Sequence, residues 1–442
     1  MRETTNTGNS YSSSYRWVVL IAFMLLAGIN QMLWLNFVPL LGQIQDRYGV
    51  SEMMATNLTV CFPLLYVLLA MPSGAMIDRR GYRFTIGVGA VIMAIFALFR
   101  IYTDSFWFLL IGQIGIAVSQ PFILNGITKL SADWFEEHQR ALATGLGTAG
   151  MFAGMALGLA LTPVLDEELG LQKTMIIFAA LTLLSSLFFL FSVRENPAVV
   201  PVQGASQGPV AVSAPGIMES PEGAEPLAGE STSSLTAFSE MIAIVRQPAL
   251  ALVIGIAFLA LGFFNGLTTW LEALLSENGV KAIDAGLIGG AMILGGIAGS
   301  ILLPGLSDHL EKRKPVLIFC GFAGLILTVP VCLSGNLTVL YWAAGFLGFF
   351  FLPGYALLLA MSEELAGAER AGGAAGALML AGNAGGVLVV AIMGILKSDV
   401  SGWRPAEYFL FAILALVCLL AFWTRESFRP GSASERNQAT GS

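Results

Sequence analysis

Polar side chains stand inside otherwise apolar stretches of this chain, where they are candidates for binding a solute. An unpaired polar group in hydrocarbon is costly, so these side chains are expected to face a protein interior or water. Amide, indole and phenol groups suit a neutral, zwitterionic or amine molecule, and no Lys or Arg lies among them to hold an anion. The candidate binding residues are Asn30, Gln31, Trp34, Gln120, Asn125, Asn265, Trp270, Tyr355 and Asn383.

Structural roles compete with binding at most of these positions. Gln113 and Gln120 are seven residues apart on one helical face, where each either reaches a cavity or bridges neighbouring helices. Trp34 and Trp270 also suit anchors near a membrane boundary. Asn30 and the residue after it also suit the repair of a helix kink. The sequence leaves these alternatives open.

A charged turn occurs twice, at 74–83 and at 305–314. Glycine lets neighbouring helices approach closely, an aspartate near a helix end accepts hydrogen bonds or pairs with a cation, and a basic cluster suits a membrane surface. An ordinary basic loop is the alternative, but the repetition favours one plan shared by both halves of the chain. The candidate gating residues are Gly74, Asp78, Arg79, Arg80, Gly81, Arg83 and Asp308.

Composition assigns the elements that position these residues to a membrane. Of 442 residues, 56% are hydrophobic and 12% are charged, against about 25% charged in soluble proteins. Apolar stretches of roughly 20 residues cross about 30 Å of hydrocarbon as helices. We predict an all-α integral membrane protein with twelve spans, at 16–41, 55–76, 83–102, 106–129, 140–165, 172–193, 248–275, 284–306, 314–333, 338–361, 372–396 and 405–423.

The spans form two groups of six, which predicts two six-helix bundles at 16–193 and 247–424. Between them, 194–246 is rich in Pro, Gly, Ser and Ala, which predicts a flexible linker. Residues 1–15 and 425–442 are predicted to be disordered tails. If both termini are cytoplasmic, most basic residues fall inside, and the outer loops keep Arg47, Arg100, Lys173, Lys281, Lys397 and Arg404. This asymmetry predicts cytoplasmic termini and a cytoplasmic linker.

The turn at 74–83 resembles the signature loop of the major facilitator superfamily (MFS), and the turn at 305–314 stands where that family repeats it. Six helices, a linker and six further helices complete the resemblance, which covers 16–423. The resemblance implies two bundles that rock about a central site by alternating access. It also implies that the first, fourth, seventh and tenth helices line the cavity.

The first half resembles the feline leukaemia virus subgroup C receptor-related (FLVCR-like) transporters. The residues that carry this likeness are Trp34, Tyr48-Gly49-Val50, Asp78-Arg79-Arg80-Gly81, Gly112-Gln113, Ser119-Gln120-Pro121-Phe122-Ile123-Leu124 and Trp134-Phe135. The group is associated with choline, ethanolamine or haem. The resemblance implies substrate contacts at Trp34 and Gln120, and an amide at Asn383. The family's aromatic residue on helix seven is replaced near Phe264 and Asn265, which departs from a complete aromatic cage.

Absent charge narrows the expected mechanism. No Asp, Glu, Lys, Arg or His lies in the middle third of any predicted span, whereas proton-coupled carriers usually bury a titratable relay there. We therefore expect facilitated diffusion of a neutral, zwitterionic or amine solute, such as a choline-like or ethanolamine-like molecule. The alternatives are a proton-coupled carrier of organic anions or drugs, and a membrane sensor that keeps the fold without transport.

Small residues predict close helix packing. Gly150, Gly154 and Gly158 are spaced by four, as are Gly286 and Gly290, and Gly295 and Gly299. In the family the fifth and eighth helices face one another, so the resemblance implies that these stripes are sliding surfaces of a gate. Static packing is the alternative.

Other classes of protein find little support. The chain has two histidines, no metal-spaced cluster and no nucleophile elbow, so we expect neither an enzyme nor a metal site. We expect no cofactor and no nucleic-acid partner. The expected partners are a small-molecule substrate and the lipid bilayer, with the chain acting as a monomer in a plasma (inner) membrane. All four cysteines lie in apolar stretches and predict no disulfide framework.

Overall fold

Inside lipid, a backbone satisfies its hydrogen bonds most simply as a helix, and the apolar stretches of this chain are helical. The computed structural model describes residues 15–194, 246–367 and 370–428. The N-terminal half contains α1 (Tyr15–Leu35), η1 (Val38–Leu40), α2 (Leu41–Tyr48), α3 (Glu52–Phe99), α4 (Phe106–Leu124), α5 (Ile127–Trp134), α6 (Glu137–Leu169) and α7 (Leu171–Ser192). The C-terminal half contains α9 (Pro248–Ser276), α10 (Ala282–His309), α11 (Lys314–Leu333), α12 (Leu337–Ala366), α13 (Ala371–Leu396) and α14 (Arg404–Trp423).

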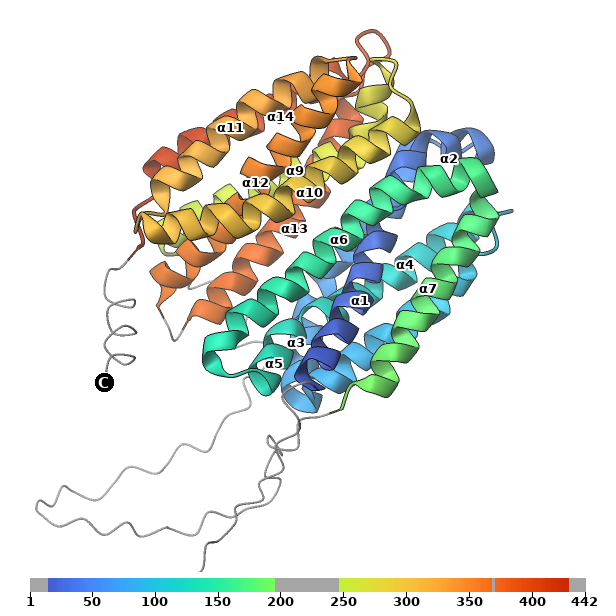
Figure 1. Cartoon of the computed structure of the whole chain (residues 1–442). Coiled ribbons are helices and arrows are strands. Elements are labelled where there is room, and N and C mark those ends of the chain that lie inside the picture. The colour runs from blue at the N-terminus through green and yellow to red at the C-terminus, as the bar shows by residue number, and fades with distance from the viewer. Residues whose placement is uncertain (1–14, 195–245, 368–369, 429–442) are drawn as a thin grey trace, which may run out of the picture.

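The two ends of the molecule are named after the segment that connects the two halves, which begins after α7. The Tyr15 hydroxyl donates to the Ser192 carbonyl oxygen, so α1 begins where α7 ends. We call this the linker end and the opposite side the far end. The predicted linker at 194–246 and the predicted tails lie, except at their edges, outside the described residues. In Figure 1 the N-terminal half runs from blue to green and the C-terminal half from yellow to red, with α6 and α10 along their border.

Helix α3 contains two crossings of the membrane. Its 48 residues would measure about 72 Å as one straight helix, more than twice the hydrocarbon thickness. Gly81 breaks it with φ 79° and ψ 165°, a conformation that suits glycine. Near the start of α3, Met53 contacts Gly394 at the end of α13. Directly after the end of α3, Arg100 lies over the ring of Phe37. Both ends of α3 therefore lie at the far end.

Counting α3 twice confirms the predicted number of spans. Eleven helices in the described part of the chain are long and apolar enough to cross a bilayer. With the reversal at Gly81, they make twelve crossings in two six-helix bundles.

The first predicted span is wrong at its far end. Helix α1 ends at Leu35 rather than at Leu41, and the chain continues as η1 and α2. Pro39 explains the break, because proline lacks an N–H donor and restricts the residue before it. Both side-chain polar atoms of Asn36 are buried at the break without a partner in the described residues. The short η1 packs against α6, α9 and α10, so it lies between the halves.

The halves are in contact at the far end. At the far end, Gly286 of α10 packs against Leu159 and Pro163 of α6, and Lys397 pairs with Glu52 across the halves. A Cβ added near the linker end of α3, α6, α10 or α13 would meet open space, at Gly74, Gly145, Gly305, Gly372 and Gly376. The structure is therefore closed at the far end.

The glycine stripes do not all lie at a gate. A Cβ at Gly154 would overlap the carbonyl oxygen of Gly28 on α1, so the stripe of α6 faces a helix of its own half. Gly295 and Gly299 face α12, also within one half. Only the stripe with Gly286 and Gly290 meets α6 from the other half. The interpretation as sliding surfaces is therefore wrong for the stripe of α6 and for the stripe with Gly295 and Gly299, because a helix of the same half already fills each of these faces.

Candidate functional site

Two predicted residues of α1 are held by hydrogen bonds within the N-terminal half. Asn30 Nδ2 donates to Ser119 Oγ of α4 at 3.1 Å. Trp34 Nε1 donates to the carbonyl oxygen of Thr59 in α3 at 3.2 Å, and its ring stacks on Phe62 with centroids 6.2 Å apart. These contacts join α1 to α3 and α4. The Asn30 amide nitrogen and the indole N–H of Trp34 are therefore occupied by the fold.

The two glutamines of α4 are in different situations. Gln113 Nε2 donates to the carbonyl oxygen of Leu33 at 2.8 Å, which is the bridge between helices that the sequence left open. Gln120 is 4% exposed, and its amide makes no hydrogen bond with the described residues. Gln31 Oε1 is also buried without a partner in this part of the chain. Gln120 and Gln31 therefore keep hydrogen-bonding groups free for a ligand.

Tyr66, a tyrosine outside the predicted set of binding residues, links the halves in mid-membrane. The Tyr66 hydroxyl donates to Asn125 Oδ1 at 2.5 Å and lies 2.7 Å from Met379 Sδ of α13. Asn125 Nδ2 in turn donates to Ser73 Oγ at 2.7 Å. The buried hydroxyl of Tyr355 in α12 has no partner among the described residues. The rule applied to amides, a polar group in an apolar span, would also have found Tyr66.

The predicted amides of α9 and α13 bond to their own helices. Asn265 Nδ2 donates to the Leu261 carbonyl oxygen at 2.9 Å, and Asn383 Nδ2 to that of Met379 at 2.9 Å. Gly386 of α13 packs directly against the Asn265 side chain. In neither amide does Oδ1 accept a hydrogen bond from the described residues, so both keep an acceptor available.

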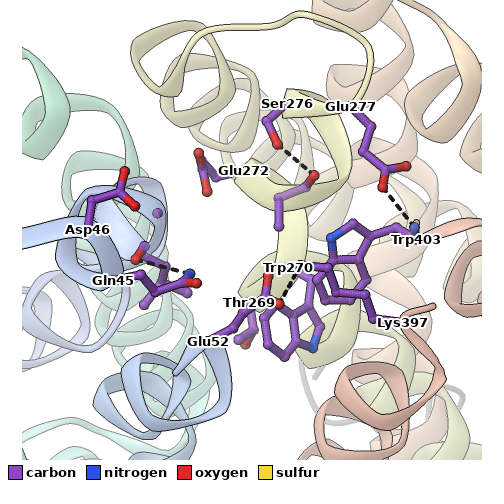
Figure 2. Close-up of a pocket in the computed structure, with 13 residues that line it drawn as sticks. Gln45, Asp46, Glu52, Thr269, Trp270, Glu272, Ser276, Glu277, Lys397 and Trp403 are labelled. Atoms are coloured by element: carbon purple, nitrogen blue, oxygen red, sulfur yellow. Dashed lines mark hydrogen bonds and ion pairs between the residues drawn. The ribbon is translucent and has the colours of Figure 1, made fainter. Parts of the chain in front are cut away.

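A pocket of about 270 Å³ lies between the halves at the far end. Trp270 forms one wall, with Nε1 donating to the Val390 carbonyl oxygen at 3.1 Å and its ring 4.6 Å from that of Trp403. Figure 2 shows Gln45, Asp46 and Glu52 of the N-terminal half facing Glu272, Trp270 and Trp403 of the other half. The lining residues are Leu41, Gly42, Gln45, Asp46, Glu52, Thr269, Trp270, Glu272, Ala273, Ser276, Glu277, Lys397 and Trp403.

Only part of this pocket is predictable from the sequence. Trp270 was predicted as a binding residue, whereas Lys397 was counted as a loop residue. Glu52 and Trp403 were not singled out. Their signal was weak, because each lies at the end of a helix where charged and aromatic residues are ordinary. Only the folding of both halves together brings them to one place.

The first charged turn is tied to the linker end of its own half. Trp134 Nε1 donates to the Tyr82 hydroxyl, which donates to the Arg194 carbonyl oxygen at 3.0 Å. The Arg80 guanidinium lies 4.9 Å from the ring centroid of Phe84. Asp78 makes no ion pair with the described residues. Tyr82 thus positions the turn, and Asp78 forms no ion pair with the described residues while the far end is closed.

The second charged turn is held by ion pairs. Arg313 lies 2.5 Å from Asp308 and 3.1 Å from Glu364 of α12. Burial opposes the charge of Arg313, but hydrogen bonds and charge contacts with Glu364 and Asp308 outweigh it and raise its pKa. Glu426 accepts hydrogen bonds from the backbone N–H groups of Arg313 and Lys314. Glu426 therefore does not belong to a disordered tail as expected, because it caps the start of α11.

Arg100 is buried rather than exposed in an outer loop. It is 2% exposed, lies 4.5 Å over the ring of Phe37 and donates to Met175 Sδ at 3.3 Å. Its Nε has no partner among the described residues. Its position in a short loop gave no sign of burial, because the covering residues come from the turn before η1 and from α7.

The described ranges contain no group of three or more His, Cys, Asp or Glu that could hold a metal ion. Cys61, Cys320, Cys332 and Cys418 are buried and free. The polar groups available to a ligand are therefore the amides and hydroxyls described above and the side chains of the far-end pocket.

Comparisons with known proteins agree with this architecture. The sequence model described as "Major Facilitator Superfamily" matches residues 23–329 and 313–441. The mouse (Mus musculus) choline/ethanolamine transporter FLVCR1 is 23% identical over 444 residues, which cover 94% of this chain and 76% of that protein. The zebrafish (Danio rerio) choline/ethanolamine transporter flvcr2a is 23% identical, covering 96% of this chain and 89% of that protein.

A solved structure shares the fold. A bacterial homologue of the human lysosomal transporter Spinster, in an inward-facing and unoccupied conformation, matches with a TM-score of 0.68 and 18% identity, covering 93% of this chain and 97% of that chain. The family match spans most of the chain, and the relatives are transporters rather than enzymes. The chain therefore belongs to the Major Facilitator Superfamily of membrane transporters, with FLVCR-like proteins among its relatives.

Proposed function

We propose that this transporter moves a small neutral, zwitterionic or amine solute, of the choline or ethanolamine kind, by facilitated diffusion and alternating access. The observation that carries the proposal is a set of buried, uncharged polar groups that find no partner among the described residues. Gln120 makes no hydrogen bond with the described residues, and Gln31 Oε1 and the Tyr355 hydroxyl are buried without partners there. A bound solute with donors and acceptors would satisfy these groups.

Charge supports this class of solute. A fixed anion would need a cation near the middle of the membrane, and Arg100 is covered by Phe37 and Met175 near the far end. An amine would find indole and phenol rings, and a cation–π contact is worth about 2 kcal/mol or more when desolvated. The names of the mouse and zebrafish relatives point the same way.

Two alternatives predict other behaviour. A proton-coupled carrier of organic anions or drugs would acidify the vesicle lumen as substrate enters. A membrane sensor would bind its ligand without flux. Neither a proton relay nor a buried carboxylate lies beside Gln120 in the described structure, which favours uniport.

The proposed orientation places the linker end in the cytoplasm. The bundles are assigned to 16–193 and 247–424, joined by a cytoplasmic linker at 194–246, in a monomer of the plasma (inner) membrane. Basic side chains gather at the linker end, at Arg79, Arg80, Arg83, Lys129, Arg140, Lys312, Arg313 and Lys314, as the positive-inside rule requires. Thiol labelling of a cysteine introduced in the linker tests the orientation, because labelling from outside intact cells would reverse it.

The test of function is counterflow of labelled choline and ethanolamine into proteoliposomes that contain the full chain. We expect saturable uptake that is trans-stimulated and produces no acidification. Loss of one hydrogen bond should raise KM about 3- to 10-fold in Gln120→Ala. The matched control is Gln172→Ala, which removes an exposed amide at the start of α7 and should leave KM unchanged. Uptake of neither amine, or equal KM values for the two variants, would refute the proposal.

A further inference from the structure

The far-end pocket carries an excess of negative charge. Asp46, Glu52, Glu272 and Glu277 line it, and Lys397 is the cation among its lining residues. Glu277 accepts a hydrogen bond from the Trp403 backbone N–H at 2.8 Å. Asp46 and Glu272 form no ion pair with the described residues. The pocket thus holds more carboxylates than its own cation neutralises.

Lys397 places a primary ammonium between two groups that bind organic cations. Its Nζ lies 2.5 Å from Glu52 Oε2 and 5.2 Å from the ring centroid of Trp403. The Lys397 side chain is 40% exposed and that of Glu52 is 22% exposed, so this ammonium position is open to exchange with solutes. A carboxylate on one side and an indole face on the other form a site for an alkylammonium ion.

The indole face is fixed in place by its surroundings. Trp403 packs on Trp270 with ring centroids 4.6 Å apart, and Trp270 Nε1 is bonded to the Val390 carbonyl oxygen. Trp403 itself is fully buried at the start of α14. Preorganised walls of this kind bind a ligand without the cost of ordering them.

We propose that the far-end pocket is a second binding site for a small organic ammonium ion, and that Lys397 is its tethered occupant. A free ammonium ion takes the position of the lysine Nζ, between Glu52 and Trp403, while Asp46 and Glu272 balance the displaced charge. The volume of about 270 Å³ is below the range of about 300–1,000 Å³ for drug-sized ligands, and it suits a small ion. This inference rests on the proposed function for the identity of the natural solute, and it adds a place where that solute binds outside the central path.

The experiment is a chemical rescue of Lys397→Ala with n-propylammonium chloride, which matches the missing side chain. The full chain is placed in nanodiscs, and its thermal stability is followed against propylammonium concentration, with sodium chloride at equal ionic strength as reference. A ligand that binds only the folded state raises its stability by mass action. We expect an apparent affinity at least about tenfold tighter for Lys397→Ala than for the wild type, where the lysine competes.

Matched variants separate this site from general effects. Lys281→Ala removes an exposed far-end lysine outside the pocket and should respond to propylammonium like the wild type. Lys397→Gln keeps the side-chain stem and tests the same site if the alanine variant folds poorly. Adding Glu52→Gln to either Lys397 variant should abolish the rescue. Equal affinities in Lys397→Ala, Lys281→Ala and the wild type would overturn the proposal, and so would a rescue that survives Glu52→Gln.

The two proposals fail separately. Rescue measures ammonium binding at one pocket and requires no flux. If the rescue is observed but choline and ethanolamine are not taken up, the second site is supported and the proposed function is refuted. If these amines are transported but no rescue is observed, the proposed function is supported and the second site is refuted.

Discussion

Gly286→Ala should open the far end without unfolding either half. A Cβ at Gly286 would overlap the carbonyl oxygen of Leu159 and lie 2.8 Å from Pro163 Cγ and 3.3 Å from Pro39 Cβ. The first two contacts belong to α6 of the other half, so the clash exists only while the far end is closed. Overpacking of this size costs about 1–3 kcal/mol. Since about 1.4 kcal/mol is a tenfold change in an equilibrium constant, an open state populated at about 1% would rise to between about 5% and about 60%.

Spin labels at Glu168 and Lys281 measure this change directly. Both residues are exposed at the far end, on α6 and beside α10. In a background without the four buried native cysteines, double electron–electron resonance in nanodiscs should show a new long-distance component in Gly286→Ala. The control is Gly354→Ala, where the added Cβ would lie 3.9 Å from Leu317 of the same half. If the two variants gave the same distance distributions, the contact of Gly286 with α6 would not be what keeps the far end closed.

Two further predictions concern stability. Gly154→Ala should lower the melting temperature by several degrees relative to Gly145→Ala, because its Cβ would lie 2.6 Å from the carbonyl carbon of Gly28, whereas Gly145 faces open space; equal melting temperatures in detergent would contradict the packing. Gly81→Ala should destabilise the fold by about 1–3 kcal/mol relative to Gly74→Ala, because only the first position has a positive φ; denaturant unfolding that ranks the two variants the other way would contradict the reversal at Gly81.

The fold followed from local properties of the sequence. The number of spans depends on hydrophobicity along the chain, and the structure confirms it. The end of the first span depended on whether the apolar residues after Leu35 continue the helix or Pro39 ends it, and composition does not show which effect prevails. Leu40 and Leu41 extend the apolar stretch, but Pro39 ends the helix before them, and the residues after it are buried between the halves instead.

The candidate site was less predictable, because its residues differ in where they point. Gln113 and Gln120 have the same side chain on the same helix, yet only the first finds a backbone carbonyl within reach, that of Leu33. Whether the amide nitrogen of a glutamine finds this partner depends on the distance between α1 and α4, and that distance is set by packing. Tyr66 shows the reverse case, since its polar group was visible in the sequence but its partner Met379 lies on the other half.

The far-end pocket and the closure of the far end depend on the same contacts. Glu52 belongs to the N-terminal half and Trp403 to the C-terminal half, so the ammonium position between them exists only while the halves are in contact there. An ammonium bound at that position must therefore favour the closed state, and opening must weaken its binding by the same factor. Lys397 supplies this stabilisation permanently, because its ammonium is covalently attached and cannot diffuse away. A free solute in its place stabilises the closed state only while bound, and it is set free between the halves when the far end opens. By the same linkage, exchange of the tethered ammonium for a free one does not weaken closure, because a solute that binds only the closed state adds to the stability of that state.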